Sequence, residues 1–207
     1  MSINIVNKID DLVKIKNVLV SVSDKRGLEG FIPKLLEINP NVQILSTGGT
    51  YGRIESILGR SADNNLTQVA QYTGQPETQG GLVKTLDFKI YLGLLTETYN
   101  EDHQRDLVRT SAVPIDMVVV NLYPFKETVS KANVTVEEAR GNIDIGGPCM
   151  IRASAKNFLR VASVVDPSDY KSILSELEKN NGDTDRTGRT PGSGSGHLCQ
   201  PHRRQPI

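Results

Sequence analysis

Short runs of aliphatic and β-branched residues alternate with segments of helical periodicity along residues 17–180. The apolar runs predict strands at 18–22, 42–45, 65–70, 92–95, 116–122 and 161–165. The periodic segments predict helices at 28–38, 50–58, 101–109, 134–140, 148–157 and 168–179. Strands that alternate with helices favour a mainly parallel sheet covered by helices on both faces. Pro33 lies inside the first helical pattern and predicts a late start or a kink.

Composition narrows the class of protein. The chain has 207 residues, with 24 basic and 24 acidic side chains. Because these charges balance, the composition gives no indication of a basic surface that would bind nucleic acid or an anionic membrane. No apolar run approaches the length of a membrane span, and the acidic, discontinuous N-terminus does not read as a signal peptide. Two cysteines exclude a disulfide scaffold. We expect a cytoplasmic α/β domain of enzyme size.

The C-terminal segment departs from this pattern. Residues 182–207 are polar and rich in glycine, and they cannot bury enough surface to offset their ordering entropy. We therefore expect a disordered or altered tail. The spacing of His197, Cys199 and His202 within it matches no zinc pattern, so we expect no metal site. His103 lies in a charged run, so histidine-based nucleophilic catalysis is poorly supported.

Two polar motifs follow the first two predicted strands. In STGGT, Thr47, Gly48, Gly49 and Thr50 open a helix directly after a strand, which is typical of a phosphate site. A plain glycine-rich turn is the alternative. In SVSDK, the side chains of Ser23 and Asp24 suit helix N-caps, while Lys25 could face the ligand crevice at the same sheet edge.

Two further motifs contain polar residues that could bind a ligand, but each is a weaker indication of function. Lys84 and Thr85 follow a pair of glycines and could clamp a phosphate or a carbonyl oxygen. Asn121 and Tyr123 stand at the end of the most apolar strand, where open α/β sheets bind ligands. Core packing explains a polar Asn121 poorly.

The most informative motif is NIDIGGP at 142–148, which precedes a helix. Gly146 and Gly147 permit close backbone approach, and Pro148 suits the first helical position. Asp144 stands just before the helix, and Lys156 lies four residues after Arg152 on one helix face. This set could bind and protonate a polar heterocycle, or it could be a capped amphipathic helix.

Seven motifs occur in one order: SVSDK, STGGT, YTGQPE, VKTL, VVVNLYPF, NIDIGG and IRASAKN. Together they resemble the N-terminal domain of the bifunctional AICAR transformylase/IMP cyclohydrolase family, over about residues 17–170. The resemblance implies a methylglyoxal-synthase-like (MGS-like) fold, a three-layer α/β/α arrangement. It divides the chain into an N-terminal extension (1–16), the cyclohydrolase domain (17–181) and the tail (182–207), without the C-terminal transformylase domain.

The resemblance also implies an activity, which is closure of the formamide FAICAR into IMP with loss of water and without cofactor or metal. It assigns catalysis to Lys156 as proton donor and acceptor, supported by Asp144, Tyr123 and Lys84. The nucleotide-binding residues that it implies are Ser23, Asp24, Lys25, Thr47, Gly48, Gly49, Thr50, Lys84, Thr85, Asn121, Asp144 and Ile145. The family further implies a homodimer and the purine nucleotides FAICAR and IMP as ligands.

One motif departs from the family pattern GRVKTLHPKIHGGIL. Leu82 stands in place of an arginine, and Asp87, Phe88 and Tyr91 stand in place of His, Pro and His. An added acid near an anionic substrate should weaken binding. A catalytically silent nucleotide- or phosphate-binding module is therefore one alternative. Methylglyoxal synthase is a second, but no histidine here lies in a ligand-facing motif.

Overall fold

The computed structural model describes residues 6, 8–75 and 85–186. Within them, a five-stranded parallel sheet has the order β4-β3-β2-β5-β6. Its strands are β2 (Asn17–Val22), β3 (Gln43–Ser46), β4 (Leu66–Gln68), β5 (Met117–Asn121) and β6 (Ala162–Val164). In the central register, Val20 lies opposite Ser46 on one side and Val119 on the other.

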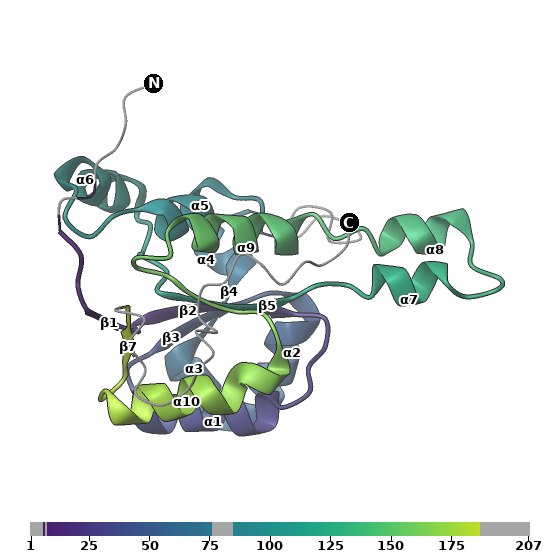
Figure 1. Cartoon of the computed structure of the whole chain (residues 1–207), viewed down its shortest axis with the longest axis horizontal. Helices are drawn as coiled ribbons and strands as arrows, with labels where there is room; N and C mark the ends of the chain where they lie inside the picture. The colour runs from purple at the N-terminus through teal and green to yellow at the C-terminus, as the bar shows by residue number, and fades with distance from the viewer. Residues whose placement is uncertain (1–5, 7, 76–84, 187–207) are drawn as a thin grey trace.

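Helices cover both faces of this sheet (Figure 1). One face carries α1 (Leu28–Ile38), α2 (Gly48–Leu58), α3 (Ala62–Asn65) and α10 (Tyr170–Lys179). The other face carries α4 (Val69–Thr73), α5 (Phe88–Leu95) and α9 (Gly146–Lys156), with α6 (Glu101–Thr110) at its end. The expected three-layer α/β/α fold is therefore confirmed.

The hydrophobic core is divided by the sheet into two clusters. Val18 and Val20 of β2 face the cluster under α1 and α10, and Leu19 faces the cluster under α5 and α9. Since both faces are covered, β2 and β5 are apolar at consecutive positions instead of alternate ones. This explains why their runs were the clearest strand signals in the sequence.

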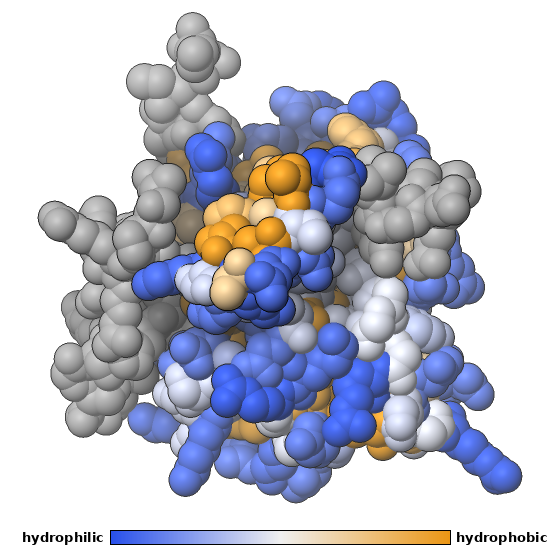
Figure 2. All heavy atoms as spheres, turned by 90° about the vertical axis from the view of Figure 1, so that its right-hand side faces the viewer, coloured by the Kyte–Doolittle hydropathy of each residue, from blue (hydrophilic) through white to orange (hydrophobic). Residues whose placement is uncertain are grey.

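Two short helices leave the layered body. α7 (Phe125–Val129) and α8 (Val136–Gly141) project from the end of the sheet beyond β5 (Figure 1). Exposed hydrophobic side chains on them include Phe125, Val129 and Val136. Figure 2, which views this end directly, shows hydrophobic side chains grouped among hydrophilic ones.

The predicted strand at 92–95 was wrong, because these residues form the second half of α5. Asp87 caps the helix through a hydrogen bond from the N–H of Lys89 to Oδ1 at 2.8 Å. Ile90 and Leu94 are buried four residues apart on one helix face. Leucine favours helix over strand, and the run has no β-branched residue after Ile90. An apolar run this short could not be assigned by periodicity alone.

Other boundaries also differ from the prediction. Pro33 lies within a continuous α1. Because proline has no N–H, the carbonyl one turn earlier lacks its helical partner, and since Pro33 is exposed, that carbonyl is accessible to water. The predicted strand at 65–70 is shorter, since α4 begins at Val69. The helix predicted from 148 begins at Gly146, and Pro148 stays in its first turn, where no intrahelical N–H is needed.

The two ends of the described chain pair with each other. β1 (Leu12–Lys14) is antiparallel to β7 (Asp183–Asp185), with Val13 opposite Thr184. Thr184 is fully buried. These strands lie in the segments that the sequence assigned to an N-terminal extension and a disordered or altered tail. Of the predicted tail, residues 183–185 form a paired strand, and residues 187–207 lie outside the described residues.

A buried ion pair ties the amino ends of β5 and β6 together. Arg160 and Asp116 are each 6% exposed, and Nη1 of Arg160 lies 3.0 Å from Oδ1 of Asp116. The second carboxylate oxygen accepts hydrogen bonds from the N–H groups of Lys16 and Asn17. Arg160 also donates to the carbonyls of Thr96 and Gly93. Burial raises the pKa of Asp116 and lowers that of Arg160, and each partner's charge opposes the other's shift.

No helix of the described residues is long and apolar enough to cross a membrane.

Removing one partner of the buried pair should be costly. Arg160→Met leaves the Asp116 carboxylate buried without its counter-charge, so the free energy of unfolding should fall by about 3–5 kcal/mol. Arg109→Met, which breaks an exposed pair with Asp106, is the control and should leave stability nearly unchanged. Urea unfolding measures both, and equal losses would contradict the role of Arg160.

A matched pair of glycines tests the packing of α5. A Cβ at Gly93 would lie 2.4 Å from the carbonyl oxygen of Val113, whereas a Cβ at Gly52 in α2 meets nothing within 4 Å. Gly93→Ala should therefore destabilise the chain by about 1–3 kcal/mol. Gly52→Ala should stabilise it by up to about 1 kcal/mol through helix propensity. Thermal unfolding of the two variants gives the comparison, and it fails if Gly93→Ala is neutral.

Candidate active site

The carboxyl ends of β2, β3 and β5 lie side by side, and their hydroxyl groups bond across the strands. The Oγ1 of Thr50 accepts from the N–H of Val22 at 3.1 Å and donates to its carbonyl at 3.0 Å. Ser21 Oγ lies 3.1 Å from Thr47 Oγ1. Thr50 is buried, and its hydrogen bonds hold the start of α2 against the end of β2. The Thr47 side chain is half-buried, so its hydroxyl lies nearer the surface. The sequence did not single out Ser21, whose partner becomes visible only when β2 and β3 pair.

The N-terminus of α2, where the sequence predicted a phosphate site, combines features that favour an anion. Gly48 has a φ of 43°, a left-handed conformation that favours glycine at the strand-to-helix turn. Lys25 lies over the next residue, since a Cβ on Gly49 would be 3.9 Å from its Cε. The unpaired N–H groups of a helix start and an ammonium group thus lie close together, which favours a phosphate.

Asn121 joins the end of β5 to the turn after β2. Its Oδ1 accepts from the N–H groups of Ser23 and Asp24 at 2.7 and 2.8 Å. Its Nδ2 donates to the carbonyl of Asp24 at 2.9 Å. One amide therefore makes three hydrogen bonds to the same turn, which leaves one N–H for any ligand. The polar residue that core packing explained poorly is the organiser of this turn.

Asp24 is occupied by a different partner. Its carboxylate accepts from Nε of Arg26 at 2.8 Å and from the N–H of the same residue at 3.0 Å. The Arg26 side-chain hydrogen bond, followed by the backbone one, lowers the pKa of Asp24. Asp24 is therefore an anion paired with an exposed arginine that the sequence analysis did not consider.

A second group of predicted residues meets at the start of α9. Asp144 Oδ1 accepts from the N–H of Gly147 at 2.8 Å. A Cβ on Gly147 would lie 2.6 Å from Asp144 Oδ2 and from Leu122, and a Cβ on Gly146 would lie 2.4 Å from Thr85 Oγ1. The two glycines are required because a carboxylate and a buried hydroxyl approach the helix start this closely.

The remaining predicted residues differ in exposure. Tyr123 and Ile145 are 51% and 56% exposed, so both are accessible to a ligand at this edge. Lys84 and Leu82 lie outside the described residues.

Lys156 is not brought to this group. It is the exposed last residue of α9, ten residues after Gly146 and thus about 15 Å along the helix axis. Its neighbour Asn157 donates to the carbonyls of Leu94 and Thr96 at the far end of α5. Asp144 and Lys156 therefore lie at opposite edges of the sheet within one chain.

The three described residues that depart from the family motif have different surroundings. Asp87 is the N-cap of α5, so its carboxylate is engaged by the N–H of Lys89. Phe88 is 61% exposed. Burial raises the pKa of Tyr91 to about 12, and the neighbouring Cys149 thiol adds to the shift.

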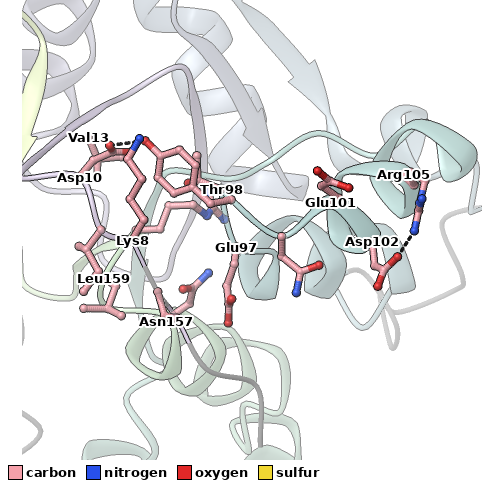
Figure 3. Close-up of a pocket in the computed structure, with 15 residues that line it drawn as sticks. Lys8, Asp10, Val13, Glu97, Thr98, Glu101, Asp102, Arg105, Asn157 and Leu159 are labelled. Atoms are coloured by element: carbon pink, nitrogen blue, oxygen red, sulfur yellow. Dashed lines mark hydrogen bonds and ion pairs between the residues drawn. The ribbon is translucent and has the colours of Figure 1, made fainter.

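A separate cavity of about 430 Å³ lies at the opposite, amino edge of the sheet (Figure 3). Lys8, Asp10 and Val13 line one side of it, and Glu97 and Asn157 the other. It contains none of the predicted site residues. Among the residues that the structure describes, no group of three or more His, Cys, Asp and Glu side chains could hold a metal ion.

Comparison with known proteins identifies the fold family. The family model described as "MGS-like domain" matches residues 27–149, more than half of the chain. The chain belongs to the MGS-like domain family. The matched region of this MGS-like chain contains the STGGT motif, Asn121 and Asp144.

Several curated relatives carry the name "Bifunctional purine biosynthesis protein PurH". The protein from Thermoanaerobacter sp. (strain X514) is 48% identical over 164 residues, which cover 79% of this chain and 31% of the relative. The protein from Leptospira biflexa is 46% identical over 175 residues, or 84% of this chain and 33% of the relative. The MGS-like chain thus spans about a third of the length of these relatives, and the expected resemblance is confirmed.

A solved structure supports the same assignment. The crystal structure of ForH is similar with a TM-score of 0.68 and 32% sequence identity. The match covers 81% of this chain and 80% of ForH. The similarity to this solved structure therefore extends over most of the chain.

The turn that Asn121 organises should depend on its side chain. Asn121→Ala leaves two N–H groups and one carbonyl without their partner, so the free energy of unfolding should fall by about 1–3 kcal/mol. Asn142→Ala removes one exposed bond to the Glu138 carbonyl and is the control. Urea unfolding and amide exchange at Ser23 and Asp24 measure the effect, and unchanged exchange would contradict it.

Proposed function

We propose that this chain is an IMP cyclohydrolase domain that closes FAICAR into IMP with loss of water, in purine biosynthesis. The observation that carries the proposal is the 48% identity to a bifunctional purine biosynthesis protein over 164 residues, which cover 79% of this chain. The cluster at the carboxyl edge of the sheet supports it, because a phosphate site and an acidic site lie at one edge.

The phosphate of the nucleotide would bind at the start of α2. Free N–H groups there, the Thr47 hydroxyl and the Lys25 ammonium all favour an anion. The turn held by Asn121 would then place Ser23 beside the ribose, and Thr85 would lie toward the base. Lys84, which is outside the described residues, stays a second nucleotide contact that the resemblance implies. The base and its two substituents would extend toward Asp144 and Tyr123.

The reaction needs positioning more than strong acid or base. The carboxamide nitrogen attacks the formamide carbon of the same molecule, and holding both groups in contact supplies much of the rate. The C–N bond forms as the carbonyl electrons move to oxygen, which gives a carbinolamine. The attacking nitrogen then loses a proton, and the oxygen gains one to become a hydroxyl. This hydroxyl takes a second proton and leaves as water, while the former formamide nitrogen loses its proton and forms the ring C=N bond. Asp144 and Tyr123 would move these protons, and the N–H of Gly146 at the start of α9 would stabilise the oxyanion.

Lys156 is the proton donor that the resemblance assigns, but this assignment does not follow from the fold of one chain. In this proposal Asp144 acts first at the reacting carboxamide, and Lys156 contributes only if another chain changes its surroundings. The expectations of a homodimer, of a cytoplasmic location, and of no nucleic-acid or membrane partner stay predictions.

The test is IMP formation from FAICAR by the purified chain, followed by ultraviolet absorbance. Asp144→Asn should reduce kcat by at least about 10²-fold, because it removes an acid–base group at the reacting atoms. Asp106→Asn, which alters an exposed carboxylate on α6, is the matched control and should retain full turnover. Lys156→Ala separates the two assignments, since full turnover would exclude it as proton donor. Equal activity of Asp144→Asn and wild type would contradict the role of Asp144.

A catalytically silent nucleotide-binding module is the second candidate. The observation in its favour is that Asp87, Phe88 and Tyr91 replace the family's residues next to the site, with Asp87 used as a helix cap. It predicts IMP binding by calorimetry without turnover. Dihydroxyacetone phosphate, tested in the same assay series, distinguishes methylglyoxal synthase.

A further inference from the structure

The turn that carries Ser23, Asp24 and Lys25 is held from two directions. Asn121 binds its backbone from the side of β5. On the other side the turn ends at Gly27, the N-cap of α1, whose φ is 78°. The carbonyl of Gly27 accepts from the N–H of Phe31 at 2.9 Å, so the position of this glycine sets where α1 begins.

The ring of Tyr170 packs against this glycine. A Cβ on Gly27 would lie 3.2 Å from Cδ2 and 3.6 Å from Cε2 of Tyr170. The same ring stacks on Phe31, with centroids 4.5 Å apart and an interplanar angle of 28°. Tyr170 is 5% exposed and begins α10, so a rigid, buried aromatic surface from the far end of the chain supports the turn.

The hydroxyl of Tyr170 takes no part in this contact. It is buried and has no hydrogen-bond partner among the described residues. Burial raises the pKa of Tyr170 to about 12, and the carboxylates of Asp24 and Asp166 add to the shift. The hydroxyl therefore stays protonated over the working pH range, and the packing surface is the aromatic ring.

We propose that Tyr170 is a positioning residue of the candidate nucleotide site, and that its ring holds the Ser23–Lys25 turn in place through Gly27. The proposal rests on the proposed function in that the turn is taken to bind the nucleotide. The ring of Tyr170 contacts Gly27 and Phe31, which are not predicted nucleotide-binding residues, so it acts through the backbone of the turn. The ring and Asn121 together keep the Ser23 and Asp24 amides fixed before any ligand arrives.

The experiment compares three variants of the full chain. Tyr170→Leu removes the aromatic surface, and Tyr170→Phe keeps the ring and removes only the hydroxyl. Ile173→Ala makes a cavity one turn further along α10, in the same core cluster and away from Gly27. Amide hydrogen exchange by NMR is read at Ser23 and Asp24 relative to Val20 in β2. KM and kcat for FAICAR are measured in parallel.

Tyr170→Leu should speed exchange at Ser23 and Asp24 relative to Val20 by about tenfold, and Tyr170→Phe should restore protection. KM should rise by a similar factor with little change in kcat, because the turn binds substrate and transition state alike. Ile173→Ala should lower the thermal unfolding midpoint without changing the exchange ratio or KM.

Two results would overturn the proposal. One is an exchange ratio for Tyr170→Leu that equals that of Ile173→Ala, which would make Tyr170 an ordinary core residue. The other is an equal defect in Tyr170→Phe and Tyr170→Leu, which would assign the effect to the hydroxyl. Because exchange needs no ligand, it decides the role of Tyr170 even if the wild-type chain forms no IMP, in which case the proposed function alone fails.

Discussion

The parallel pairing of β2 with β3 and β5 decides where polar groups can gather in this chain. All the strands of the sheet run the same way, so every strand-to-helix turn that follows them opens at one edge. The motifs after β2, β3 and β5 are separated by tens of residues in sequence, yet hydrogen bonds join them to one another. Since the strands are buried on both faces, their edge is the place where the sheet can present polar atoms without burying them unpaired.

The two edges of the sheet are stabilised by different chemistry. The amino edge is closed by the buried Arg160–Asp116 pair, with each charge compensated by its partner and by backbone groups. The carboxyl edge is tied by a neutral amide, Asn121, and by the Thr50 hydroxyl. Because Asn121 and the Thr50 hydroxyl are uncharged, they place no competing buried anion beside Lys25 and the start of α2. The physical consequence is an edge that is ordered yet still attractive to a phosphate.

The family resemblance and the geometry of the chain favour different catalytic residues. Asp144, Thr85 and the two glycines of α9 form one close-packed group, and this group accounts for the glycines without further assumption. Lys156 belongs to the same motif region but is carried to the other edge by the length of α9. Asp144 and Lys156 are close in the sequence but far apart in the folded chain. The kinetic comparison of Asp144→Asn with Lys156→Ala tests which of them takes part in the reaction.

The sequence by itself determined the α/β class, the helices and strands with strong periodicity, and the motifs at the sheet edge, because binary patterning and glycine positions are local signals. Only tertiary structure decided the state of 92–95, where a short leucine-rich run suits strand or helix until Gly93 packs against Val113. Tertiary contacts also decided that Asn121 organises a turn and that β1 pairs with β7. These outcomes depend on partners about a hundred or more residues away, and no local pattern encodes such contacts.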